Sequence, residues 1–202
     1  MDGQQSDDPF RAFVFKHRGA LLAIPALWLG FRGRPSAFSI ALGLPIAFAG
    51  EFLRCWAVGY SGVTTRGDRV EAPEFVSNGP YAHLRNPLYL GNFLTALGFS
   101  IAFTGGLPAR SRASVMAFGL GFMAAIYSVI IPHEEAFLAK RFGEDFALYL
   151  ERVPPIVPRL SSYSRARGEF DPAVIGKAET RTWVTFGLML AALALRARRA
   201  AG

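Results

Sequence analysis

Two short polar segments of this 202-residue chain contain side chains that could bind a small charged molecule. The first segment ends in Arg85, Asn86 and Pro87. Proline suits the first turn of a helix, and a helix start presents N–H groups and partial positive charge that favour an anionic ligand. Arg85 adds a donor that can bind a carboxylate or a phosphate through two parallel hydrogen bonds. On spacing alone, however, an arginine beside a proline is more typical of a charged anchor at a membrane boundary.

The second segment places two acids, Glu134 and Glu135, directly after Pro132 and His133. Acids at a helix start complement the helix dipole, which is a purely structural explanation. Two carboxylates opposite an arginine-bearing helix start could instead form a polar pocket, because they can pair with a ligand ammonium or with ribose hydroxyls. The residues that follow combine apolar and charged side chains in a pattern that predicts an interfacial helix: Phe137, Leu138, Arg141, Phe142 and Phe146.

Both polar segments border long apolar stretches. Residues 88–108 and 113–132 comprise 21 and 20 residues without a single charge. Since a bilayer core about 30 Å thick needs about 20 helical residues, each stretch can cross a membrane. The short polar sequence at 109–112 predicts a turn between them, so the two stretches are expected to form a helical hairpin. A buried helix pair in a soluble bundle is disfavoured because it would need a polar face.

Three weaker apolar segments, residues 19–31, 36–60 and 183–195, complete the predicted spans. Apolar and aromatic residues make up 51% of the chain, and charged residues make up only 18%. A soluble domain usually carries about 25% charged residues, so this composition favours a membrane protein. The sequence therefore predicts an all-α fold, a polytopic membrane helical bundle with about five transmembrane helices plus a cytoplasmic interfacial helix. We expect a single membrane domain over residues 1–202.

The distribution of basic residues predicts the orientation of this bundle. With five spans, the segments on the side of the amino terminus contain 14 lysines and arginines, and those on the opposite side contain 7. This bias places the amino terminus and both polar segments in the cytoplasm, and we expect a bacterial inner membrane. In so apolar a chain, a net charge of +7 indicates contact with membrane lipids and not with nucleic acid.

Glu51 and Arg54 lie three residues apart in the second predicted span, on one helical face. Charges inside a membrane are costly and are usually paired or turned toward a cavity. A second interpretation stays open, in which the span ends near Gly50 and both side chains lie among the lipid headgroups. The single cysteine, Cys55, has no second metal ligand at a recognisable spacing, so we expect no metal site.

The two polar segments together follow a more specific pattern. It comprises Gly79-Pro80-Tyr81, Arg85-X-Pro87-X-Tyr89-X-Gly91, the apolar hairpin, Glu134-Glu135 and Phe142-Gly143-X-X-Phe146-X-X-Tyr149. Over residues 75–160 this pattern resembles the isoprenylcysteine carboxyl methyltransferase and phospholipid methyltransferase superfamily, in which this region is the catalytic half. The resemblance implies an integral-membrane enzyme that uses S-adenosylmethionine to methylate a lipophilic small molecule or a lipid. Carboxylate, amine and thiol acceptors all stay open.

The resemblance also implies which residues form the site. Arg85, Pro87 and Tyr89 fall on the superfamily's Arg-His-Pro-X-Tyr motif, and Asn86 stands where histidine is commoner. Arg85 and Glu134 are the expected catalytic residues. An amine acceptor would have to lose a proton, for which Glu134 and His83 are the nearest candidates, because asparagine cannot act as a base near neutral pH. The expected cofactor-binding residues are Tyr81, His83, Arg85, Asn86, Pro87, Tyr89, Glu134 and Glu135.

Two other functions stay open. A membrane reductase of the sterol and steroid type would bind NADPH, whose extra phosphates call for more basic residues than an acidic pair provides. A non-catalytic membrane subunit or small transporter would account for the glycines of the hairpin, such as Gly98 and Gly121, which suit close helix packing. Binding of S-adenosylhomocysteine, the product form of the cofactor, would favour the methyltransferase over both.

Overall fold

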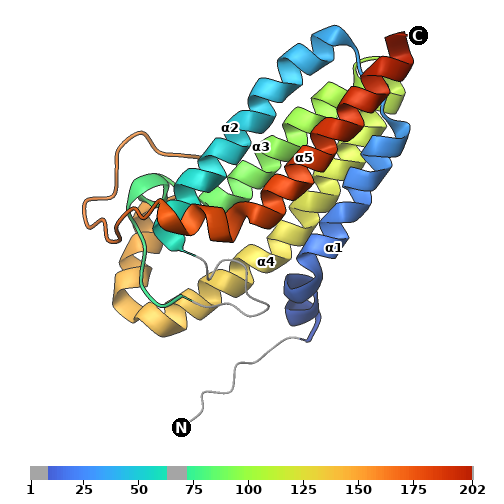
Figure 1. The fold of residues 1–202 in the computed structure, drawn as a ribbon. Coiled ribbons are helices and arrows are strands. Elements are labelled where there is room, and N and C mark those ends of the chain that lie inside the picture. The colour runs from blue at the N-terminus through green and yellow to red at the C-terminus, as the bar shows by residue number, and fades with distance from the viewer. Residues whose placement is uncertain (1–8, 63–71, 202) are drawn as a thin grey trace.

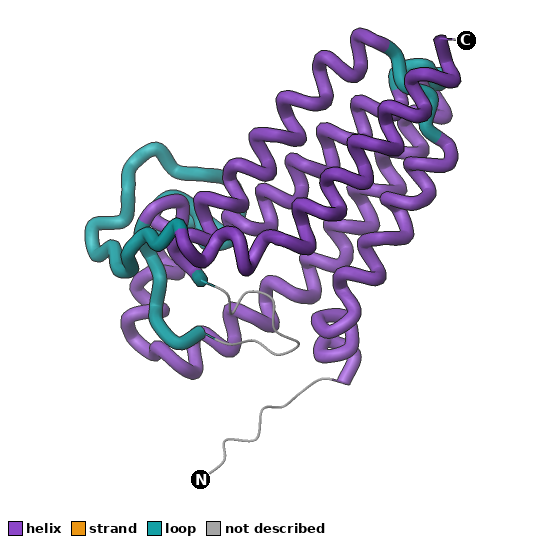
Figure 2. The backbone as a smooth tube through the Cα atoms, in the orientation of Figure 1, coloured by secondary structure: helices purple, strands orange, loops and turns teal. Residues whose placement is uncertain are grey.

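The computed structural model describes residues 9–62 and 72–201, and this part of the chain folds into a bundle of long helices (Figure 1). The described residues contain helices and loops and no strand, as Figure 2 shows. The predicted all-α fold is therefore confirmed. The elements are α1 (Pro9–Arg32), α2 (Ala37–Ser61), a short 3-10 helix η2 (Gly79–Ala82), α3 (Pro87–Thr104), α4 (Ala109–Arg152) and α5 (Ala173–Ala201).

Four of the helices, α1 to α4, are long and apolar enough to cross a membrane. Large apolar side chains also point outward from the bundle, among them Phe38, Phe48 and Phe52 of α2, as expected for helices surrounded by lipid. The chain is thus an integral membrane protein. The predicted fifth span, residues 183–195, lies in α5, which packs along the same bundle but is not among these four helices. Arg66 and Arg69, which contribute to the predicted charge bias, lie outside the described residues.

Two predicted boundaries differ from the structure. The first predicted span, residues 19–31, is the second half of a longer helix, because α1 begins at Pro9 and has 24 residues. The predicted turn at 109–112 is helical, since α4 begins at Ala109 and the chain turns at residues 105–108 instead. Polarity alone was misleading here, because arginine is a good helix former.

α4 is a single long element with one break. Its part before the break, residues 109–142, is long enough to cross a bilayer core and to continue beyond it. Phe137 and Phe142 of the predicted interfacial helix continue this part of α4, whereas Phe146 lies in the helix beyond the break. Gly143 breaks the helix with a φ of 53° and a ψ of −124°, a conformation that glycine adopts readily. Beyond this break, Phe146 and Tyr149 pack in a buried cluster with Ala82 of η2.

α2 and α3 approach each other closely because glycines lie along their interface. A methyl group added at Gly50 would lie 2.5 Å from the carbonyl oxygen of Gly91. One added at Gly98 would meet the backbone of Ala47. No described atom of another helix lies within 4 Å of such a methyl group at Gly121 of α4, so the expectation that Gly121 serves close helix packing is wrong.

The two ends of the bundle have different roles. In Figure 1, η2, the start of α3, the end of α4 and the start of α5 lie at one end, and the carboxyl terminus lies at the other. At the carboxyl-terminal end, Arg196 of α5 donates a 2.8 Å hydrogen bond to the carbonyl oxygen of Gly30 in α1 and another to that of Phe31. The fold thus ties α1 to α5 at one end and gathers the predicted site residues at the other.

Candidate active site

Arg85 joins three segments of the chain at the start of α3. Its Nε donates a 2.8 Å hydrogen bond to Glu135 Oε1 on α4. Its Nη1 donates to the carbonyl oxygens of Val153 and Leu150, at 2.6 and 3.1 Å. Its backbone N–H donates to the carbonyl oxygen of Pro154 at 2.9 Å. The two predicted polar segments therefore meet, and Arg85 holds the acidic pair against the loop that follows α4.

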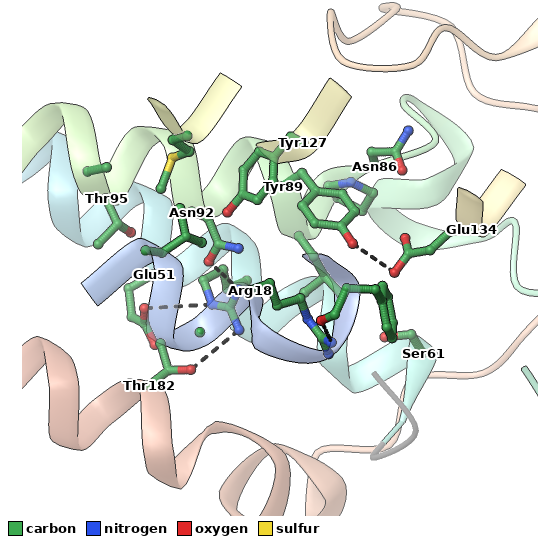
Figure 3. A pocket seen from close by; sticks show the side chains of 18 of the residues that line it. Arg18, Glu51, Ser61, Asn86, Tyr89, Asn92, Thr95, Tyr127, Glu134 and Thr182 are labelled. Atoms are coloured by element: carbon green, nitrogen blue, oxygen red, sulfur yellow. Dashed lines mark hydrogen bonds and ion pairs between the residues drawn. The ribbon is translucent and has the colours of Figure 1, made fainter. Parts of the chain in front are cut away.

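Tyr89 provides the partner of the other acid. Its hydroxyl donates a 2.7 Å hydrogen bond to Glu134 Oε1, as Figure 3 shows. The Tyr89 ring also packs against Tyr127 of α4, with ring centroids 4.6 Å apart. Each acid of the pair is therefore oriented by its own donor, Glu134 by a phenol and Glu135 by a guanidinium.

Asn86 supports the same corner from the residue before α3. Its Nδ2 donates a 3.1 Å hydrogen bond to the carbonyl oxygen of Pro155 and lies 3.5 Å from Glu135 Oε1. Pro87 follows in the first turn of the helix, as predicted. Asn86 is buried, and it links the start of α3 to the loop beyond α4. An asparagine at this position of the motif thus has local hydrogen-bond partners of its own.

Tyr81 and His83 have different surroundings although they are close in sequence. Tyr81 lines the cavity described below, and burial raises the pKa of its phenol well above its usual value, so the group stays protonated and can donate a hydrogen bond. The Nδ1 of His83 lies 2.9 Å from the carbonyl oxygen of Arg159, and this side chain is not part of the cavity lining. The structure therefore separates His83 from the other predicted site residues.

A cavity of about 860 Å³ extends from this corner into the bundle. Its volume lies within the range of about 300–1,000 Å³ that is typical of small-molecule sites. Its polar end contains Tyr81, Arg85, Asn86, Pro87, Tyr89, Glu134 and Glu135. Its apolar end contains side chains from α1, α3, α4 and α5: Leu29, Phe99, Val115, Phe186 and Met189. A polar and an apolar ligand bound at opposite ends would therefore meet inside the bundle.

A second polar cluster lies deeper in the bundle, between α2, α3 and α5 (Figure 3). Arg54 Nη2 donates to both carboxylate oxygens of Glu179, at 2.8 and 2.9 Å, and to Thr182 Oγ1 at 3.4 Å. Arg54 Nη1 donates to Asn92 Oδ1. Glu51 Oε2 lies 4.0 Å from Arg54 Nε. We call Arg54, Asn92 and Glu179, with Glu51 and Thr182, the Arg54 cluster.

The burial of this cluster bears on both interpretations of Glu51 and Arg54. α2 continues as a helix to Ser61, so both residues lie within it, and where the lipid headgroups meet this helix stays a prediction. Glu51 and Arg54 are 8% and 7% exposed and both line the cavity, so the two side chains are buried in the bundle and turned toward the cavity.

Sequence reasoning missed Asn92 and Glu179. Two signals could have identified them. Asn92 is an amide within an uncharged span, and Glu179 lies three residues before Thr182, on the same helical face at the start of an apolar stretch.

A bundle of membrane-crossing helices around a cavity with a polar corner and an apolar interior defines an integral-membrane protein with a ligand site. Similarity to known proteins identifies the family. The family model for phospholipid methyltransferase matches residues 38–145, more than half of the chain, and the chain belongs to this family of membrane methyltransferases. The resemblance inferred from the polar motifs is thereby confirmed. The match includes the cavity residues of α2, α3 and most of α4 and leaves out α5.

The chain is also similar to individual proteins, two of which are named as isoprenylcysteine O-methyltransferases. The chain is 42% identical over 94 residues to the cobalt-zinc-cadmium resistance protein CzcN of Cupriavidus metallidurans. This match covers 46% of this chain and 38% of that protein. It is 32% identical over 83 residues to the protein-S-isoprenylcysteine O-methyltransferase of Schizosaccharomyces pombe. This match covers 41% of this chain and 32% of that protein. It is 28% identical over 120 residues to protein-S-isoprenylcysteine O-methyltransferase B of Arabidopsis thaliana. This match covers 57% of this chain and 57% of that protein. The chain thus spans less than two thirds of each relative, and no solved structure matches it significantly.

Proposed function

We propose that this protein uses S-adenosylmethionine to methylate a lipophilic small molecule or a lipid, at a carboxylate or an amine. The observation that carries the proposal is the single cavity that joins the acidic pair of a methyltransferase family to an apolar interior. An apolar interior disfavours water and suits an apolar acceptor that would arrive from the bilayer. The bias of basic residues supports a polar end that faces the cytoplasm of a bacterial inner membrane.

The donor and acceptor groups at the polar end fit this cofactor. Tyr89 donates a hydrogen bond to one oxygen of Glu134, and Arg85 donates one to one oxygen of Glu135. A carboxylate can accept about four hydrogen bonds, so both acids retain capacity for ribose hydroxyls or for an ammonium group. Their negative charge suits a sulfonium cation, and Lys16, Arg18 and Arg181, which also line the cavity, would suit the phosphates of NADPH, so ligand binding has to separate the methyltransferase from a reductase. Tyr81 adds a protonated hydroxyl at the same end.

The bound cofactor would supply an electrophilic methyl group on a sulfonium centre. The protein's part is then to hold the acceptor atom about 3 Å from that methyl and to keep water away. Arg85 is engaged by Glu135 and by two backbone carbonyls, so its contacts favour a positioning role over direct contact with the reacting atoms. If the acceptor is an amine, Glu134 is the candidate for removing its proton, because His83 does not line the cavity.

Ligand-dependent stability of the purified protein in detergent tests the proposal. A ligand that binds only the native state stabilises it by mass action, so S-adenosylhomocysteine at about 100 times its Kd should add about 2.7 kcal/mol and raise the Tm. NADPH at the same concentration should leave the Tm unchanged. The methyltransferase proposal fails if NADPH stabilises the protein and S-adenosylhomocysteine does not.

A labelled methyl group tests the reaction itself. Wild-type protein incubated with S-adenosylmethionine that carries a labelled methyl should transfer the label into a membrane lipid extract, where the product identifies the acceptor. A double variant, Glu134→Gln with Glu135→Gln, is the control for the site. Unchanged S-adenosylhomocysteine binding by this variant would show that the acidic pair is not the cofactor site.

A further inference from the structure

The wall of the cavity is incomplete on one side of the bundle. In the described part of the chain, none of the lining residues of α2, α3 and α4 is exposed. The lining residues of α1 and α5 include five exposed ones: Lys16, Gly19 and Ala23 on α1, and Arg181 and Thr185 on α5. The remaining exposed lining residues, Pro73 and Glu74, belong to the loop before η2 at the polar end. Since a residue that lines a cavity and is also exposed lies at an opening, the cavity opens at its polar end and, separately, between α1 and α5.

The opening between α1 and α5 lies between small residues at matching depths. The two helices run in the same direction, and Arg196 of α5 joins them at the far end through its hydrogen bond to the Gly30 carbonyl (Figure 1). Gly19 lies 11 residues before Gly30, and Thr185 lies 11 residues before Arg196. At 1.5 Å per residue, both therefore lie about 16 Å from that hydrogen bond. We call the opening beside Gly19, Ala23 and Thr185 the α1–α5 window.

Two basic side chains indicate where the window lies in the membrane. Lys16 and Arg181 precede Gly19 and Thr185 by about one helical turn, toward the polar end of the bundle. Long basic side chains at the ends of membrane helices extend toward the lipid headgroups. The window is thus expected just inside the hydrocarbon core, next to the headgroups. A lipophilic molecule at this depth would have its polar group near the polar end of the cavity.

We propose that the lipophilic methyl acceptor enters the cavity from the bilayer through the α1–α5 window, with Gly19, Ala23 and Thr185 forming its passage. This inference rests on the proposed function for the nature of the entering molecule and adds the route that the molecule takes. Both helices of the window lie outside residues 38–145, the segment that the family model matches. The passage is therefore built by the parts of this chain that the family model does not describe.

Reaction of a thiol inside the cavity tests the route without requiring methyl transfer. Cys55→Ala removes the single cysteine, and Ala96→Cys places a thiol on α3 at a lining position that is not exposed. In liposomes of the full-length protein, N-dodecylmaleimide dissolved in the bilayer should alkylate this thiol, whose S–H adds across the maleimide double bond. Gly19→Trp and Thr185→Trp, each added to this protein, should slow the reaction about tenfold because the indole fills the window. Intact-protein mass spectrometry measures the rate.

Gly187→Trp is the matched control for these two variants. Gly187 is exposed on α5 and, like Gly19, has no described atom of another helix within 4 Å of an added methyl group, but it does not line the cavity. Its variant should react at the rate of the parent protein, and Ala23→Trp provides a further blocking variant if Gly19→Trp or Thr185→Trp fails to fold. Equal rates in the blocking variants and the control, or no reaction of the parent protein, would overturn the inference.

Methyl transfer and cofactor binding separate this inference from the proposed function. With Cys55 and Ala96 unchanged, the blocking variants should lower the transfer of labelled methyl into a membrane lipid extract about tenfold. Their Kd for S-adenosylhomocysteine should stay within about twofold of the wild-type value, because the cofactor enters at the polar end. Full methyl transfer in the blocking variants would also overturn the inference. Failure of wild-type protein to bind S-adenosylhomocysteine would instead contradict the proposed function, whatever the rate of the thiol reaction.

Discussion

The Tyr89 hydroxyl on α3 and the Glu134 carboxylate on α4 are joined by a 2.7 Å hydrogen bond at the polar end of the cavity. The two residues are 45 positions apart, on the helices before and after the turn of the hairpin. The phenol fixes the direction of one carboxylate oxygen. The hairpin that crosses the membrane therefore also sets the geometry of the proposed cofactor site.

Tyr89→Phe removes only the hydroxyl that orients Glu134. We expect the Kd for S-adenosylhomocysteine to rise about fivefold, since a hydrogen bond to a charged group contributes about 1.5–3 kcal/mol and part of it is recovered by relaxation. Isothermal titration in detergent measures the change. Tyr163→Phe is the matched control, because Tyr163 packs in the buried cluster with Tyr149 and does not line the cavity. An equal loss of affinity in both variants would argue against a specific role for Tyr89.

His83→Ala tests the separation of His83 from the site. Since His83 faces the carbonyl of Arg159 and not the cavity, the variant should bind S-adenosylhomocysteine with an unchanged Kd. Arg85→Ala should weaken binding strongly, because it releases Glu135 and the loop after α4 together. The same titration compares the two variants. A large loss of affinity in His83→Ala would restore this histidine to the cofactor site.

Arg54→Met should destabilise the protein by about 3–5 kcal/mol, because it leaves the fully buried Glu179 without its partner charge. The double variant Arg54→Met with Glu179→Leu should be more stable than the single one, since it removes the buried Glu179 carboxylate together with its guanidinium, and Glu51 is the same in both variants. Thermal unfolding in detergent, followed by circular dichroism, measures both. If the double variant is as unstable as Arg54→Met, the ion pair does not explain the loss.

Gly50→Val should lower the Tm because its side chain would collide with the backbone of α3 at Gly91 and Thr95. Overpacking of this kind costs about 1–3 kcal/mol. Gly121→Val is the control at a helical glycine with open space beside it, and its Tm should stay close to that of the wild type. Similar Tm values for the two variants would contradict the close packing of α2 and α3.

Much of the candidate site could be predicted from the sequence because its motifs are local. The spacing from Arg85 to Tyr89 and the adjacent acids Glu134 and Glu135 were recognisable without coordinates, and the structure brings these residues together. His83 also belongs to that local pattern, yet its side chain turns toward the loop at Arg159. Side-chain direction after a 3-10 turn depends on the packing of a distant loop, so spacing alone could not exclude it. That residues 75–160 form the catalytic half of a single domain stays a prediction.

The sequence by itself determined the membrane-crossing helices and the polar corner, because uncharged stretches and short motifs are properties of neighbouring residues. Only the tertiary structure decided that Arg54 pairs with Glu179, 125 residues away, and that Asn92 completes the same cluster. Such a pairing depends on how α2, α3 and α5 are rotated about their axes, which the glycine contacts between α2 and α3 help to set. No local pattern encodes that rotation, because it results from packing among several helices at once.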